Sequence, residues 1–288
     1  MISRAFAILL FLFLAGPARA DTVADWNRIA LDLAVRSEQT LEQRLRAMAT
    51  VHVAMFEALN FVEGRYRSHF IVRSPRLHGV SAEAVAAAAA HHVLADLYPA
   101  QRRSLAVALK SSMEALAGGR GSVPMGNSIA AAVRAVAPSD GAPWLLDAAA
   151  LADAFPAQGP VRARHESIEA PIDIYFGTSP LTWNGRVAEL ISTRGLSPVG
   201  AARIHALVSM AIADAYAVAR ESGHPCAQCI ATPAVAAILD SELGARLDLL
   251  IERSSKLEQD MGRQIAGYAL QRYRRATSPA ASSPAPAR

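Results

Sequence analysis

The chain has 288 residues, of which 52% are hydrophobic and 6% aromatic, and it carries a net charge of +4. This length and apolar content suit one domain with a sizeable core. The basic residues are spread along the chain and form no patch interleaved with aromatic residues, which argues against a nucleic-acid partner.

The first twenty residues have the organisation of a secretory signal. Arg4 is followed by an apolar run over residues 5–15 and then by Ala18-Arg19-Ala20. A basic, apolar and small-residue order of this kind predicts cleavage after Ala20. The apolar run is shorter than the roughly 20 residues that a spanning helix needs. We therefore expect a periplasmic or secreted protein, and no later segment is expected to span a bilayer.

Most of the remaining chain has apolar residues at helical spacing. The segment from Ser81 begins with a residue that can cap a helix and stops before Pro99. The next predicted helix covers residues 101–117, and Gly118-Gly119 predicts its end. The predicted helices cover residues 24–37, 42–61, 81–98, 101–117, 128–136, 198–221, 233–243 and 252–274.

Two segments lack this periodicity. Residues 137–180 hold many Pro, Gly and Asp residues, which predicts a long irregular connection. Residues 276–288, rich in Ala, Ser and Pro, are expected to be a disordered tail. The aromatic residues expected to pack the connection are Trp144, Phe155, Tyr175 and Phe176. With no strand pattern and no internal repeat, the sequence predicts one all-α domain over residues 21–275.

Several short stretches, in order along the chain, combine apolar residues at helical spacing with a few polar residues. They are Trp26-Asn27-Arg28-Ile29-Ala30, residues 46–60 followed by Arg65-Tyr66-Arg67, residues 86–99, Gly195-Leu196-Ser197-Pro198, Ala202-Arg203 and residues 210–215. Together they resemble the helices of bacterial members of the vanadium-dependent haloperoxidase and type 2 phosphatidic acid phosphatase superfamily. The resemblance covers most of the chain after the signal and implies a helical bundle of that type.

One stretch, His224-Pro225-Cys226-Ala227-Gln228 followed by a small-residue helix, resembles the second signature of that superfamily. The signature reads aromatic-Pro-Ser-Gly-His, so Cys226 falls on the Ser, Ala227 on the Gly and Gln228 on the His. In the superfamily the Ser and Gly hold vanadate or a phosphoryl group at a helix N-terminus, and the His acts as acid or base. The resemblance implies that the helix is kept and the catalytic histidine is lost.

The other two signatures are missing. The first is Lys-x6-Arg-Pro, yet the chain has only Lys110 and Lys256 and no Arg-Pro dipeptide. The third contributes an Arg and the His that binds the metal or attacks phosphorus, yet no His follows position 224. Counting back from Met261-Gly262-Arg263, which resembles the closing helix, places Leu250 near that His. The resemblance therefore implies a bundle shortened in its catalytic half.

An alternative alignment uses Ser222-Gly223-His224, which spells three letters of the second signature but shifts the small-residue helix out of phase. It leaves the other signatures missing. Arg220, Arg246 and Arg253 are the nearby cations that could replace the lost ones. Their convergence on the start of the Cys226 helix would favour an enzyme.

The two cysteines, Cys226 and Cys229, are the chain's only thiols. In an exported protein they can form a disulfide, and this or another structural role is the preferred interpretation. Redox chemistry at a helix N-terminus, or zinc binding with His224 as a third ligand, are the alternatives. His52 and His205 are expected in the core, with Asp214 and Glu57 paired to arginines such as Arg46 or Arg203.

Two hypotheses about function follow from these residues. The first is an exported, non-catalytic protein, kept as a binding or interaction module or as a degenerate copy, with no cofactor. The second is an enzyme: a haloperoxidase or acid phosphatase with a rearranged vanadate or phosphate site, or a thiol-dependent activity at Cys226 and Cys229. A shortened bundle would expose apolar faces, which a homodimer could cover.

Overall fold

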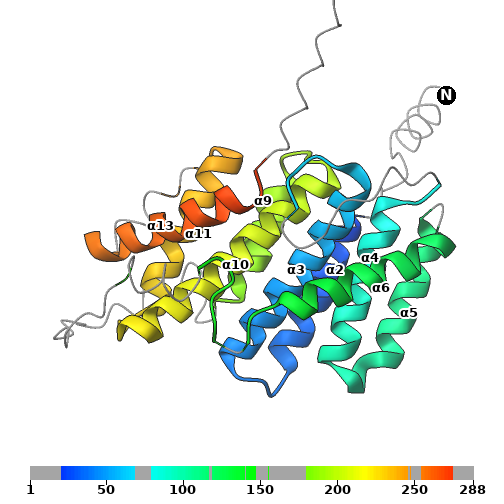
Figure 1. Cartoon of the computed structure of the whole chain (residues 1–288), viewed down its shortest axis with the longest axis horizontal. Coiled ribbons are helices and arrows are strands. Elements are labelled where there is room, and N and C mark those ends of the chain that lie inside the picture. Colours follow the sequence, from blue (N-terminus) through cyan, green and yellow to red (C-terminus); the bar gives the residue numbers. More distant parts are fainter. Residues whose placement is uncertain are drawn as a thin grey trace, which may run out of the picture.

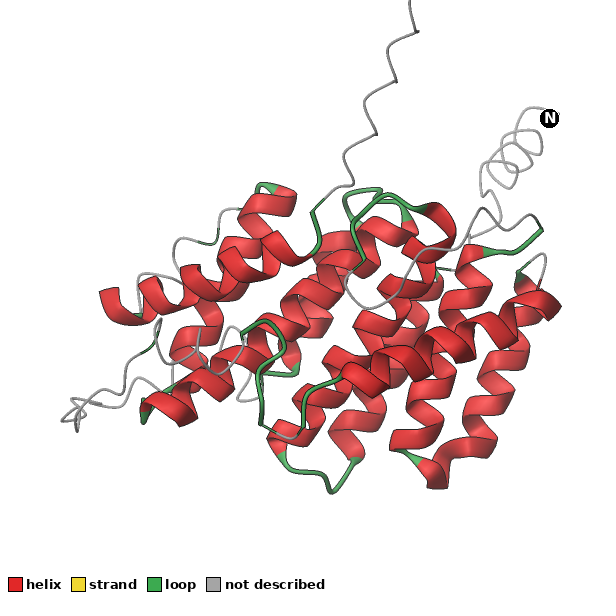
Figure 2. Ribbon diagram, in the orientation of Figure 1, coloured by secondary structure: helices red, strands yellow, loops and turns green. Residues whose placement is uncertain are grey.

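The computed structural model describes residues 21–68, 79–116, 119–139, 141–146, 155, 180–245, 247 and 254–274. Figure 2 shows only helices and loops in these ranges, so the predicted all-α class is confirmed. The signal segment, the tail, Tyr175 and Phe176 lie outside the described residues. The elements are α2 (Thr22–Arg36), α3 (Leu41–Glu63), α4 (Ala82–Leu97), the 3-10 turn η1 (Pro99–Gln101), α5 (Arg102–Ala115), α6 (Gly119–Val136), α9 (Thr182–Ser192), α10 (Pro198–Ser222), α11 (Ala227–Leu243) and α13 (Lys256–Arg272).

Two long helices, α3 and α10, pack side by side near the middle of the molecule (Figure 1). Helices α4, α5 and α6 lie on one side of this pair, while α11 and α13 lie on the other. The N-terminal and C-terminal halves of the chain therefore meet along the contact between α3 and α10.

The central helices have well-defined ends. Thr40 and Gln43 form a capping box at the start of α3, and Ser197 caps α10 with Pro198 in its first turn. Each helix ends at a glycine with a left-handed backbone, Gly64 at φ 65° and Gly223 at φ 69°. Between these ends both helices are buried on nearly all sides, which explains why they are apolar without a clear polar face.

Two pairs of helices approach closely because small residues face each other. A Cβ atom on Gly126 of α6 would lie 2.5 Å from the Val85 carbonyl oxygen of α4, beside the buried alanine block of that helix. A Cβ atom on Gly262 of α13 would lie 2.8 Å from both the Ala234 nitrogen and the Ile230 carbonyl oxygen of α11. Glycine is therefore required at both positions for these backbones to pack at this distance.

The structure adds one helix to the predicted set and corrects the starts of two others. Helix α9 was not predicted, α6 begins at Gly119 instead of residue 128, and α11 begins at Ala227 instead of residue 233. Each of these two helices contains a proline after its first turn, Pro124 in α6 and Pro233 in α11. Packing against α4 and α13 compensates for the backbone hydrogen bond that each proline removes.

The described part of the irregular connection is fixed by a buried carboxylate. Asp214 of α10 accepts hydrogen bonds from the backbone N–H groups of Trp144 at 2.5 Å and Leu145 at 2.9 Å. Burial raises the pKa of Asp214 to about 7, against the opposite effect of these N–H donors. Trp144 and Phe155 are buried, as the sequence predicted.

Of the two arginines named as partners for Asp214 or Glu57, Arg203 has other partners. Arg203 forms an ion pair with Glu242, donates from Nε to the Tyr273 carbonyl oxygen at 2.7 Å, and lies over the ring of Tyr66. The expected role of Arg203 is therefore corrected: it joins the end of α13 to α10.

Helix α10 is, by length and composition alone, a candidate membrane span. In the structure 89% of its most apolar window is buried within the protein. The central helix of a bundle has the same property.

Candidate functional site at the start of α11

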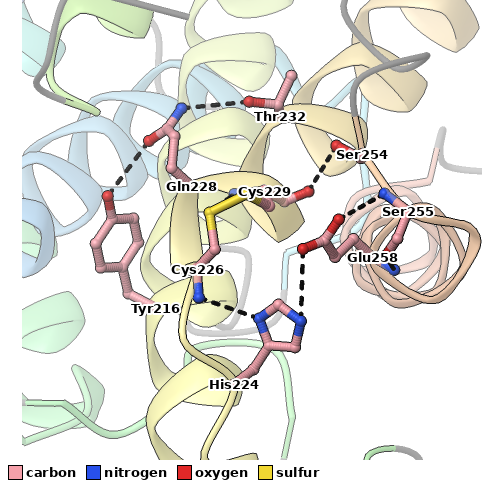
Figure 3. The surroundings of a disulfide bond; sticks show 9 residues. All are labelled: Tyr216, His224, Cys226, Gln228, Cys229, Thr232, Ser254, Ser255 and Glu258. Atoms are coloured by element: carbon pink, nitrogen blue, oxygen red, sulfur yellow. Dashed lines mark hydrogen bonds and ion pairs between the residues drawn. A yellow bond between two sulfur atoms is a disulfide. The ribbon is translucent and has the colours of Figure 1, made fainter. Parts of the chain in front are cut away.

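The start of α11 is closed by a disulfide between Cys226 and Cys229 (Figure 3). Cys226 is the N-cap residue and Cys229 lies three positions later in the first turn, with 5.3 Å between their Cα atoms. Residues at this spacing face the same side of a helix, so the fold brings the two sulfur atoms together. The Cys226 sulfur also accepts a hydrogen bond from the Cys229 N–H at 3.2 Å.

His224 lies in the tight turn between α10 and α11. Its backbone N–H donates to the Ala219 carbonyl oxygen at 2.7 Å. The ring nitrogen Nδ1 accepts from the Cys226 N–H at 3.2 Å, which places the proton of the neutral ring on Nε2. Nε2 faces the Glu258 carboxylate at 3.5 Å, and the two side chains are only 5% and 8% exposed.

Glu258 is held in position by the start of α13. Its second carboxylate oxygen accepts from the Ser255 N–H at 2.6 Å, and the Ser255 hydroxyl accepts from the Glu258 N–H at 3.3 Å. This capping box aims the carboxylate of α13 at His224. The site therefore joins residues that are more than thirty positions apart in the sequence.

Ser254 compensates for the proline inside α11. Pro233 has no N–H to donate to the carbonyl oxygen four residues earlier, which belongs to Cys229. The Ser254 hydroxyl donates to that oxygen instead, at 2.9 Å (Figure 3). The first turn of α11 is thus tied through a side chain to the residue that precedes the N-cap of α13.

Gln228 occupies the position aligned with the histidine of the second signature. Its amide oxygen accepts from the Tyr216 hydroxyl and its amide nitrogen donates to the Thr232 hydroxyl, both at 3.3 Å. Burial raises the pKa of Tyr216 to about 12. The amide of Gln228 does not titrate near neutral pH, so it cannot take the general acid or base role of the histidine that it replaces in the alignment.

The alternative alignment falls on the end of a helix. Ser222 is the last residue of α10, and its hydroxyl donates to the Val218 carbonyl oxygen at 2.7 Å. Gly223 then ends the helix with its left-handed backbone. Among the aligned residues it is Cys226, Ala227 and Gln228 that lie at a helix start.

Of the three candidate replacement cations, the structure describes one. Arg220 is paired with Glu42 at 3.2 Å and with Glu221 at 2.6 Å, and it donates to the Gly141 carbonyl oxygen. Arg246 and Arg253 lie outside the described residues, as does Leu250. The described guanidinium group is therefore bound by carboxylates of this chain.

A second polar cluster is fully buried between α2, α3, α9 and α10. His52 Nδ1 lies 2.7 Å from the Ser209 hydroxyl and His52 Nε2 lies 2.9 Å from the Asn27 amide oxygen. The Ser209 hydroxyl oxygen also lies 3.1 Å from the Asn184 amide oxygen. His205 stacks beside His52, with 4.9 Å between ring centroids. The two histidines lie in the core as expected, but sequence reasoning did not identify Asn27, Asn184 or Ser209 as partners.

The described chain has a surface groove of about 1140 Å3 at the opposite end of α10 from the disulfide. The starts of α2, α4 and α10 line it, together with Glu63 and Arg65. Burial raises the pKa of Glu63, with Arg65 opposing the shift and Glu83 adding to it. None of the residues named by the second signature lines this groove.

Within the described residues no group of three or more His, Cys, Asp or Glu side chains is arranged to hold a metal ion. Cys226 and Cys229, which a zinc site would use as thiolates, are joined to each other. Comparison of the chain with protein-family models, with curated proteins and with solved structures found no match.

Proposed function

We propose that this chain is an exported all-α protein of the haloperoxidase and phosphatidic acid phosphatase type that has lost its oxyanion site and acts without that chemistry. The observation that carries the proposal is the start of α11. Where the superfamily places a hydroxyl, an amide and a catalytic histidine, this chain has a disulfide and a glutamine whose amide is bonded to Tyr216 and Thr232.

The charges at this helix start support the same proposal. An oxyanion needs several cationic donors directed at one point. Among the described residues, His224 and Glu258 form the ionisable pair beside the disulfide, and the Glu258 carboxylate repels an anion. Arg220 is bound to Glu42 and Glu221, so an oxyanion would have to compete with two carboxylates for it.

Thermal unfolding of the mature protein with and without millimolar orthovanadate or phosphate tests the proposal. A ligand that binds only the folded state raises the unfolding midpoint. We expect no shift beyond that given by sulfate at the same ionic strength, and no halide oxidation or phosphatase activity. A specific rise with vanadate would overturn the proposal and favour the rearranged site, and Arg220→Ala, Arg246→Ala and Arg253→Ala would then identify its cations.

Rebuilding the second signature provides a sharper version of this test. The triple variant Cys226→Ser, Ala227→Gly and Gln228→His restores the Ser, Gly and His of the signature but none of the missing Lys and Arg donors. We expect the variant to show no vanadate-dependent rise in midpoint, because the charge of the oxyanion stays uncompensated. Vanadate binding by this variant would show that a cation cage persists elsewhere in the chain.

Export and self-association are separate parts of the proposal. Asp21, the first residue after the proposed cleavage site, is the N-cap of α2 and accepts from the N–H groups of Val23 and Ala24. We expect the protein recovered from periplasm or medium to begin at Asp21, and a cytosolic protein that retains residues 1–20 would contradict export. Light scattering should report a homodimer, and a compact monomer would contradict it.

A further inference from the structure

The two sulfur atoms at the start of α11 are not equivalent. Cys226 is the partly exposed N-cap residue, whereas Cys229 is only 9% exposed and lies in the first helical turn beneath it. An incoming thiol therefore reaches one sulfur more readily than the other. Such a division between an accessible and a shielded sulfur at a helix N-terminus suits thiol–disulfide exchange.

The surrounding bonds also favour exchange over a purely structural role. A bridge between residues three apart closes a very short loop, so it removes little conformational entropy from the unfolded chain. The helix start is held independently by the Cys226 N–H bond to His224 and by the Ser254 bond to the Cys229 carbonyl oxygen. Both bonds involve the backbone, so they can persist when the sulfur atoms separate.

The same geometry stabilises a thiolate. The Cys229 N–H points at the Cys226 sulfur at 3.2 Å, and the free N–H groups of a helix N-terminus favour negative charge. A hydrogen-bond donor and a helix N-terminus of this kind lower the pKa of a thiol and make it a better leaving group and nucleophile.

We propose that Cys226 and Cys229 form a thiol–disulfide exchange site, in which Cys226 forms the mixed disulfide with a dithiol partner and Cys229 is the sulfur that leaves in that step. When the reaction runs in reverse, the Cys229 thiolate attacks the mixed disulfide and releases the partner. A thiolate of the partner attacks the Cys226 sulfur, the bond between the two cysteines breaks, and Cys229 leaves as a thiolate that takes up a proton. The partner's second thiolate then attacks its own sulfur in the mixed disulfide and displaces Cys226. The pair gains two electrons and two protons, and the partner is oxidised to a disulfide.

The inference goes beyond the proposed loss of oxyanion chemistry and does not rest on it. His224 and Glu258 do not enter the electron balance. By accepting the Cys226 N–H through Nδ1, His224 is a positioning residue that fixes the N-cap, and Glu258 orients its ring.

The first test measures how fast dithiothreitol reduces the disulfide of the full mature protein, with alkylation and mass spectrometry as the readout. We expect the folded protein to be reduced at least as fast as the same protein in denaturing urea, with its helical circular dichroism retained. Reduction about a hundredfold slower in the folded state would mark a shielded structural bridge and would overturn the proposal.

The second test separates the two sulfurs. Cys229→Ser retains Cys226, and Cys226→Ser retains Cys229. The reduced Cys229→Ser protein should form a mixed disulfide with oxidised glutathione about tenfold faster than the Cys226→Ser protein. Equal rates, or faster reaction of Cys229, would contradict the assigned roles.

The third test measures turnover. With dithiothreitol as electron donor, the wild-type protein should accelerate the reduction of insulin disulfides, and both single variants and the double variant should lose the acceleration. Because the double variant has no thiol at all, it gives the uncatalysed baseline. A wild-type rate equal to that baseline would overturn exchange activity.

Discussion

The molecule contains two histidine-centred polar clusters with opposite surroundings. The cluster around His52 is enclosed by four helices, and its histidine bonds to neutral side chains only. The cluster at the start of α11 places its histidine between a backbone N–H and a carboxylate, next to a disulfide in which Cys226 is partly exposed. A polar side chain in a helix core is therefore not in itself a sign of chemistry. What separates the clusters is access from solvent and the presence of a group that can react.

The first prediction tests the structural role of the enclosed cluster. His52→Ala removes two buried hydrogen bonds, leaves Ser209 and Asn27 without this partner, and opens a cavity. We expect a loss of about 3–5 kcal/mol in the free energy of unfolding, measured in urea. His92→Ala, on the partly exposed face of α4, is the control and should change stability by less than about 0.5 kcal/mol. A small loss at His52 would show that the network does not hold the four helices together.

The second prediction concerns acid stability. Burial lowers the pKa of His205 to about 4, and burial with the neighbouring His205 lowers the pKa of His52 well below its ordinary value. Both rings stay neutral in the folded state, whereas the unfolded chain binds a proton on each below about pH 6.5. Their contribution to stability is therefore lost as the pH falls from about 6.5 towards 4, by about 3 kcal/mol for His205 alone.

Asp214 has the opposite effect on the pH dependence of stability over part of the same pH range. With a folded pKa of about 7, it holds a proton that the unfolded chain releases, so its contribution is lost as the pH rises through 7. Comparing wild type with His205→Leu cancels this effect, because both proteins keep Asp214. Urea unfolding at pH 7.5 and 4.5 should show a smaller acid loss in the variant. Parallel pH dependence would mean that His205 does not control acid stability.

The sequence predicted the all-α class and located helices with clear caps, such as the one that follows Ser81. It failed where tertiary contacts outweigh local signals: the helices predicted to begin at residues 128 and 233 begin earlier, and Pro124 and Pro233 lie within helices that pack against a neighbour. At the site, the three-residue spacing of the cysteines predicted their proximity. No local pattern could connect them to Glu258, because that contact depends on how α13 packs against α11.

The third prediction disturbs the packing of α13 on α11, which supports the cluster at the start of α11, without changing any polar group of that cluster. In Gly262→Ala the new Cβ would meet Pro233, Ala234 and Ile230 of α11 at 2.7–2.8 Å, and two of these contacts are with backbone atoms. We expect a loss of about 2–3 kcal/mol, since α13 must move away from α11. Gly267→Ala is the matched control in the same helix: nothing lies within 4 Å of its Cβ, and alanine there should stabilise by about 0.5–1 kcal/mol. If the two variants were equally stable, α11 and α13 would not pack as closely as described.

The fourth prediction has the smallest effect and the clearest internal control. Ser254→Ala leaves the Cys229 carbonyl oxygen without its side-chain donor and should cost about 1–2 kcal/mol in the free energy of unfolding. Pro233→Ala supplies a backbone N–H that can donate to the same oxygen. The serine substitution should therefore cost less in the Pro233→Ala background than in wild type, which a double-mutant cycle in urea measures. Additive effects would show that Ser254 does not replace the hydrogen bond that Pro233 removes. A positive coupling would mean that the turn carrying both cysteines is held by Ser254 as well as by the disulfide. The proposed exchange needs such support, because the turn must keep its shape while the disulfide is open.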